Sequence, residues 1–138
     1  MNNPVFIEIK KFDSWAKSQN DTSQDDIGGE WECNYENWDK IYTTFKNFLN
    51  QTDSNNWSET EKELLLYIIA RDNESGYLAN LLNESALIIL AKHSVIHGKR
   101  DDKWQLAIQL HKLSDLHLAT TLLEQFEMTM KNMLTEEL

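Results

Sequence analysis

Two histidines stand four positions apart, a spacing that metal sites on helices use. On a helix, His93 and His97 would lie on the same side. A zinc-enzyme motif would carry glutamate directly after the first histidine, but Ser94 stands there. Asp101 or Asp102 could supply a third ligand only after a turn. We therefore interpret the two histidines as side chains near a helix C-terminus, where the negative end of the helix dipole stabilises positive charge. We predict no metal and no cofactor. A metal-dependent helical enzyme using both histidines is the alternative.

Acidic side chains gather in one part of the sequence. The 138-residue chain has a formal net charge of −10, and residues 20–40 hold seven acidic side chains against one lysine. This balance disfavours nucleic acid as a partner, because phosphate contacts need clustered Lys and Arg, and it favours a basic protein. The alternative is that these acidic residues form a solvated surface that keeps the protein soluble and binds no partner. We expect the partner-binding residues to be Asp25, Asp26, Glu30, Trp31, Glu32, Glu36, Asp39, Asp72 and Glu74.

Within this set, Trp31 is the expected anchor, because aromatic side chains amid charges are common binding hot spots. The run Arg71-Asp72-Asn73-Glu74 has two interpretations. It is an interaction surface at a helix end, or a network in which Arg71 donates to the last carbonyls of the helix and pairs with a carboxylate. Asp72 and Glu74 can face solvent in either case.

Catalytic motifs are missing from the sequence. Cys33 has no cationic or histidine neighbour that would activate a thiolate. The sequence has no Gly-rich phosphate loop, no nucleophile elbow and no cysteine pair for a metal. We therefore predict that the protein is not an enzyme.

The helices that position these residues are expected to pack around one apolar stretch, Leu64–Ala70. It contains seven residues without a charge, and Ser58 with Glu61 before it forms a capping-box pattern. A helix that is apolar on every side must be buried on every side. The sequence therefore predicts a central helix over residues 58–71.

Helical periodicity predicts further helices around this one, over residues 4–18, 34–50, 75–82, 84–97, 102–113 and 115–135. A strand over Val5–Ile9 is the alternative for the first. Gly98 is expected at the C′ position of one helix, and Asp102 with Gln105 as the cap of the next. Residues 19–33 are predicted to form a long acidic loop, which in a compact domain is usually functional or mobile.

These elements predict an all-α fold with a single helical domain over residues 1–138. About seven helices, packed as antiparallel hairpins, would form a short solenoid or an irregular bundle. The single cysteine forms no internal disulfide, no apolar run is long enough to span a membrane, and the N-terminus lacks a signal-peptide pattern. We therefore expect a cytoplasmic protein; its oligomeric state stays open.

Three segments carry a resemblance to a known type of protein. They are Gly29–Trp38, Leu64–Glu74 and Arg100–Ala107, within residues 28–110. Together they resemble small bacterial helical proteins of the HEAT-repeat-like type. The resemblance implies a protein-binding scaffold, and some bacterial proteins of this type are similar to immunity proteins that neutralise a cognate toxin.

The sequence therefore favours a non-catalytic protein-binding module, an immunity protein that binds a basic toxin domain. The metal-dependent enzyme is the second hypothesis. A structural, self-assembling helical module is the third.

Overall fold

The computed structural model describes residues 3–19, 32, 34–72 and 75–137, with side chains as far as residue 133. This part of the chain forms seven α-helices and no strand, so the predicted all-α class is confirmed. The helices are α1 (Pro4–Ser18), α3 (Trp38–Gln51), α4 (Glu59–Arg71), α5 (Tyr77–Leu81), α6 (Glu84–His97), α7 (Arg100–Gln109) and α8 (Leu116–Glu137). Two 3-10 turns, η2 (Ser54–Asn56) and η3 (Leu110–Lys112), lie in the connections. The strand alternative over Val5–Ile9 is wrong, because α1 runs through it.

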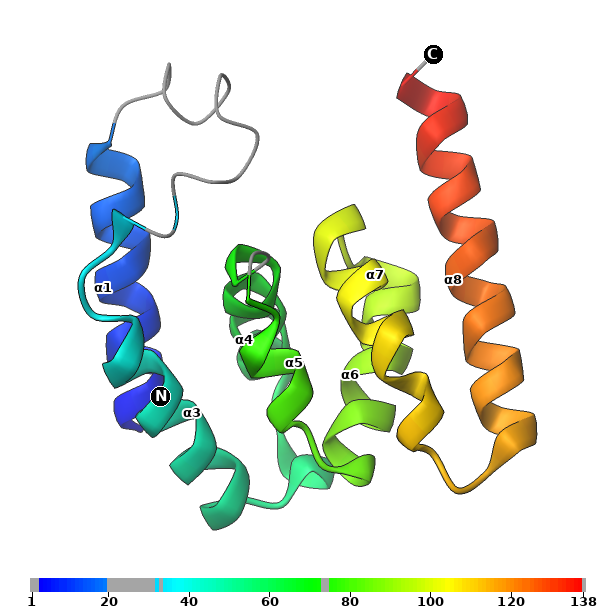
Figure 1. Ribbon diagram of the computed structural model, residues 1–138, viewed down its shortest axis with the longest axis horizontal. Helices are drawn as coiled ribbons and strands as arrows, with labels where there is room; N and C mark the ends of the chain where they lie inside the picture. Colours follow the sequence, from blue (N-terminus) through cyan, green and yellow to red (C-terminus); the bar gives the residue numbers. More distant parts are fainter. Residues whose placement is uncertain (1–2, 20–31, 33, 73–74, 138) are drawn as a thin grey trace.

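The helices follow one another along the long axis of the molecule, from α1 and α3 through α4 to α7 and then α8 (Figure 1). Two series of neighbours can be traced: α1, α4, α6 and α8 form the first, and α3, α5 and α7 form the second. Each series packs against the other through α1 with α3, α4 with α7 and α6 with α7. One surface of the protein is therefore built from α3, α5 and α7.

The central helix forms as predicted. Ser58 accepts from the backbone N–H of Glu61, and the Glu61 carboxylate accepts from the backbone N–H of Ser58, which completes the capping box. Leu65, Ile68 and Ile69 are fully buried. The core around them includes residues of the other six described helices. Leu64, Tyr67 and Ala70 are only half-buried, so the expected burial on every side is not complete.

Helix α3 begins four residues later than the predicted residue 34. The chain bends before Trp38 because two aromatic side chains take tertiary positions. The ring of Tyr35 packs edge-on against Phe12 with the centroids 5.1 Å apart. The indole N–H of Trp38 donates to the carbonyl of Glu32 at 2.8 Å. Asn34 stays exposed and does not begin the helix.

The connection between α6 and α7 differs from the prediction. Gly98 has φ −76°, an extended conformation, rather than the left-handed one of a C′ glycine. A Cβ at this position would overlap the side chains of Asp102 and Ser94 and the Ser94 carbonyl, so close packing requires the glycine. Helix α7 begins at Arg100, and Asp102 lies inside its first turn, where it accepts from the backbone N–H of Lys99. The predicted cap at Asp102 is therefore wrong.

The buried side of α7 is also not the predicted one. Trp104, Ala107, Ile108 and His111 share one face of the predicted helix over residues 102–113, a face expected to be buried, but they are half-buried or exposed. Lys103 and Gln105 are buried instead. The Lys103 ammonium donates to the carbonyls of Ser94 and Val95 in the last turn of α6. These hydrogen bonds allow a polar side of a helix to face the core.

Among the described residues, no helix has both the length and the apolar character needed to span a bilayer.

Candidate functional site

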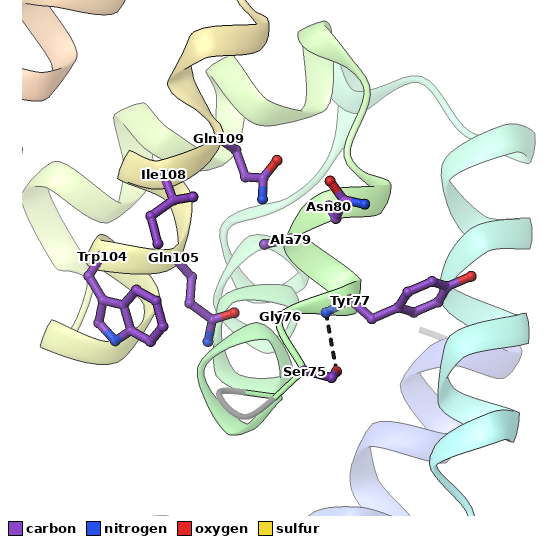
Figure 2. Close-up of a pocket in the computed structure, with 9 residues that line it drawn as sticks. All are labelled: Ser75, Gly76, Tyr77, Ala79, Asn80, Trp104, Gln105, Ile108 and Gln109. Atoms are coloured by element: carbon purple, nitrogen blue, oxygen red, sulfur yellow. Dashed lines mark hydrogen bonds between the residues drawn. The ribbon is translucent and has the colours of Figure 1, made fainter.

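A surface pocket lies between α5 and α7. Its volume is about 330 Å³. Helix α7 contributes four residues that share one side of the helix: Trp104, Gln105, Ile108 and Gln109. The other wall is made by α5 and the residues just before it: Ser75, Gly76, Tyr77, Ala79 and Asn80. Figure 2 shows these side chains, with the two glutamine amides between the helices.

The opposite wall depends on one glycine. Gly76 has φ +62°, a left-handed conformation that glycine adopts without steric cost. It directly precedes the short helix α5. The backbone N–H of Tyr77 donates to the Ser75 hydroxyl at 3.3 Å (Figure 2), which also fixes the turn. This turn sets Tyr77 beside the mouth of the pocket.

Two carbonyl oxygens in the α7 wall lack hydrogen-bond partners. The amide nitrogen of Gln105 donates to the backbone carbonyl of Ile69 at 2.6 Å, which fixes the orientation of the side chain. The remaining oxygen of Gln105 and the side-chain oxygen of Gln109 are both buried without a donor. A buried acceptor without a donor costs free energy. Both oxygens are enclosed by protein atoms, so a ligand in the pocket reaches them only if the amides turn toward it.

Aromatic and apolar side chains surround the pocket. Tyr77 is 42% exposed and Ile108 is 56% exposed, while Trp104 is half-buried. From Tyr77 the aromatic surface continues onto α3. Tyr42 contacts Tyr77 edge-on at 4.7 Å between centroids, and Trp38 stacks on Tyr42 at 5.7 Å. The surface of α3, α5 and α7 thus carries the rigid ring surfaces that recur at binding hot spots.

The predicted acidic residues divide into three groups. Glu36 and Asp39 are exposed, and Asp39 lies in the first turn of α3. Glu32 and Asp72 are buried. The others lie outside the described residues: Asp25, Asp26, Glu30, Trp31 and Glu74.

The two buried carboxylates have internal partners. Glu32 lies 3.5 Å from the guanidinium of Arg71, and burial raises the pKa of Glu32 despite that cation. Asp72 accepts from the Tyr42 hydroxyl at 3.0 Å, the Ser75 hydroxyl at 2.7 Å and the backbone N–H of Leu78 at 2.9 Å. Both carboxylates therefore hold elements together. Of the expected network, the pairing of Arg71 with a carboxylate is present, whereas Asn73 and Glu74 lie outside the described residues. Asp72 supports the turn that forms one wall of the pocket.

Sequence reasoning missed the pocket itself. The sequence places Trp104 and Ile108 on one face of a predicted helix and Gln105 in the cap of that helix, and it assigns no role to Gln109. Two amide side chains four residues apart place two polar groups on one side of a helix. That spacing is the signal that was present in the sequence.

The histidine pair lies away from this pocket, on α6. His93 is buried and its Nδ1 lies 3.2 Å from a carboxylate oxygen of Glu59 on α4. The acidic side chain that joins the two histidines is Glu59, and not the expected Asp101 or Asp102. Asp102 is held by Ser94 and by the backbone N–H of Lys99.

Comparison with protein-family models, with curated protein sequences and with solved structures finds no match for this chain. The class of protein is therefore defined by the fold and the pocket alone: an all-α protein in which α3, α5 and α7 form a surface with an aromatic-rimmed pocket.

Proposed function

We propose that this protein is a non-catalytic, cytoplasmic protein-binding module, and specifically an immunity protein that binds and neutralises a basic toxin domain of bacterial origin. The observation that carries the proposal is the pocket between α5 and α7. Exposed Tyr77 and Ile108 stand at its rim, and two unpaired amide oxygens lie in its wall.

The chemistry of the pocket suits a Lys or Arg side chain of the partner. Both side chains bring only N–H donors, which the amide oxygens of Gln105 and Gln109 would accept once these buried amides turn toward the pocket. The ring of Trp104, which lines the pocket, attracts a cation through its π face, whereas the Tyr77 ring points toward α3 (Figure 2). The net charge of −10 attracts a basic partner from a distance.

The acidic residues add a second element to the proposed surface. Asp39 and Tyr42 are on neighbouring turns of α3, and Tyr42 contacts Tyr77 at the rim of the pocket. The exposed Glu36 and Asp39 would thus contribute charge near the aromatic surface. Charges at the margin of an interface mainly accelerate association, whereas buried anchors determine how long the complex lasts.

The identification with an immunity protein rests on the resemblance of residues 28–110 to HEAT-repeat-like bacterial proteins. Helical solenoids of that kind use extended surfaces of stacked helices for binding. Toxins that act on nucleic acid have basic active sites, so an acidic, aromatic surface would both steer toward such a site and block it.

Co-expression tests this proposal. The product of the adjacent open reading frame is produced with and without this protein, and growth is measured together with complex formation by size-exclusion chromatography. Rescue of growth and a stable complex are expected. Toxicity that persists, with no complex formed, would contradict an immunity function.

Matched variants then locate the binding surface. Ile108→Ala and Tyr77→Ala remove exposed side chains at the pocket, and we expect each to weaken the complex by about tenfold or more, as truncation of a hot spot does. Ile96→Ala is the control, because Ile96 is 75% exposed on α6 and does not line the pocket. Equal affinities for Ile108→Ala and Ile96→Ala would place the interface elsewhere.

A further inference from the structure

Three potential metal ligands converge between α4 and α6. His93 and His97 stand on successive turns of α6, and their ring centroids are 4.8 Å apart. Glu59, in the first turn of α4, joins them. One ligand atom from each of the three residues lies within 4.8 Å of the others. The fold therefore completes a histidine pair whose third ligand is not adjacent in sequence.

The distance between Glu59 and His93 fits coordination. A carboxylate oxygen of Glu59 lies 3.2 Å from Nδ1 of His93. In a tetrahedral zinc site with bonds of about 2.0–2.1 Å, neighbouring ligand atoms are about 3.3 Å apart. This pair of atoms thus already has the separation that a shared ion requires, and the exposed His97 ring needs only a side-chain rotation to approach it.

Internal hydrogen bonding does not account for the whole His93 ring. Its side chain is only 4% exposed, and Nε2 is buried without a hydrogen-bond partner. The nitrogen that faces Glu59 is Nδ1, so Nδ1 is the candidate metal ligand. An ion bound there does not reach Nε2, which lies on the other side of the ring and keeps its unmet hydrogen bond.

The site is accessible to an ion and to water. A cavity of about 400 Å³ is lined by both histidines. Three acidic residues also line it, Glu63, Asp101 and Asp102, against the basic Arg71 and Lys99. Glu59 does not line this cavity, so the cavity borders the site on the histidine side only. A water molecule at the fourth position, the arrangement found in open zinc sites, would enter from that side.

One neighbour competes with a metal ion. The ammonium of Lys62 lies 3.3 Å from the other carboxylate oxygen of Glu59. Binding of a cation must therefore overcome the repulsion by Lys62. Removal of the Lys62 charge should therefore strengthen metal binding, whereas removal of a ligand should weaken it.

We infer that Glu59, His93 and His97 form a binding site for Zn²⁺ or a similar divalent transition metal, which joins α4 to α6 and keeps one position for water. Two imidazoles and one carboxylate are a ligand set that zinc accepts, and a calcium or magnesium site would need more oxygen ligands. The inference departs from the sequence-based expectation of no metal and is independent of the proposed partner surface.

Calorimetric titration of the full chain with Zn²⁺, together with the visible spectrum of the Co²⁺ form, tests the site. Wild-type protein is expected to bind one ion and to give a tetrahedral Co²⁺ spectrum. His97→Gln and Glu59→Gln replace exposed ligands, so both variants should fold. Each should weaken Zn²⁺ binding by more than the 10- to 100-fold that follows removal of a group that only supports a ligand. His111→Gln and His117→Gln are the controls, because both histidines are exposed outside the cluster.

Lys62→Met completes the test. Loss of its charge is expected to strengthen Zn²⁺ binding by about threefold to tenfold, since a cation beside Glu59 disappears. The absence of binding in the wild type, or equal affinities for His97→Gln and His117→Gln, would overturn the site. Loss of binding in His97→Gln but not in Glu59→Gln would contradict the role of Glu59.

Discussion

Arg71, the last residue of α4, lies 3.5 Å from the buried carboxylate of Glu32 and 5.2 Å above the ring of Tyr67. The ion pair ties the end of the central helix to a residue that lies close to the acidic segment in sequence. Glu32 also accepts the indole N–H of Trp38 through its backbone carbonyl. A single position thus connects α3, α4 and the segment that precedes α3.

Removal of Arg71 is expected to destabilise the protein more than removal of both partners. Arg71→Met leaves the Glu32 carboxylate buried without its cation, which we expect to cost about 1–3 kcal/mol of unfolding free energy. In the double variant Arg71→Met with Glu32→Gln, no uncompensated charge stays buried, so part of this loss should be recovered. Urea denaturation measures both values. A double variant that is less stable than Arg71→Met would show that the ion pair is not the cause.

Two half-buried tyrosines, Tyr42 and Tyr67, predict that the protein loses stability in strong base. Burial raises the pKa of Tyr42 and of Tyr67 to about 12, and their hydrogen bonds to Asp72 and Asp13 add to the effect. In the unfolded chain a tyrosine ionises near pH 10. Between about pH 10 and 12 the unfolded state releases protons that the folded state keeps, so the stability that is present below pH 10 falls as pH rises.

Ultraviolet titration of the phenolates checks this assignment. The wild type should show a group of tyrosines that ionises near pH 12, and Tyr42→Phe and Tyr67→Phe should each remove part of that group. Tyr77→Phe is the control, because its ring is exposed. Ionisation of Tyr42 and Tyr67 near pH 10, as in the unfolded chain, would contradict the effect of their burial.

Charge reversal of the exposed acidic residues is expected to slow partner association. Glu36→Lys with Asp39→Lys should reduce the association rate by about threefold to tenfold at low ionic strength, while dissociation changes little. A second variant reverses Asp25, Asp26 and Glu30 and tests the part of the acidic segment outside the described residues. Stopped-flow measurements at several salt concentrations are the readout, and the slope against salt should become shallower. Unchanged rates in both variants would exclude the acidic surface from recognition.

Two glycines are expected to respond differently to substitution. Gly76→Ala and Gly76→Asn place a side chain at φ +62°, and asparagine tolerates this conformation better, so it should recover part of the cost of about 1–2 kcal/mol. At Gly98 the conformation is ordinary but space is missing, so Gly98→Ala should cost about 1–3 kcal/mol and Gly98→Asn at least as much. Thermal unfolding of the four variants gives the comparison. Recovery by asparagine at Gly98 would contradict the packing explanation.

The elements that the sequence determined are those whose signals are local. The capping box of Ser58 and Glu61 acts over three residues, and the helix that follows it begins where that pattern predicts. The predicted helix over residues 84–97 is likewise confirmed, with Asn83 accepting from the backbone N–H of Ala86 as its cap. Caps and helical periodicity depend on contacts between residues three or four positions apart, and such contacts can be read along the chain.

The tertiary structure alone decided which side of each helix is buried and which side chains meet. Lys103 is buried because it can reach the final carbonyls of α6, a contact that the periodicity of α7 does not encode. Asp72 is enclosed because the hydroxyl of Tyr42 comes to it from α3. Glu59 meets His93 because α4 and α6 lie side by side. These contacts join residues far apart in the sequence, and their free energy depends on how whole helices pack, so composition and spacing could not specify them.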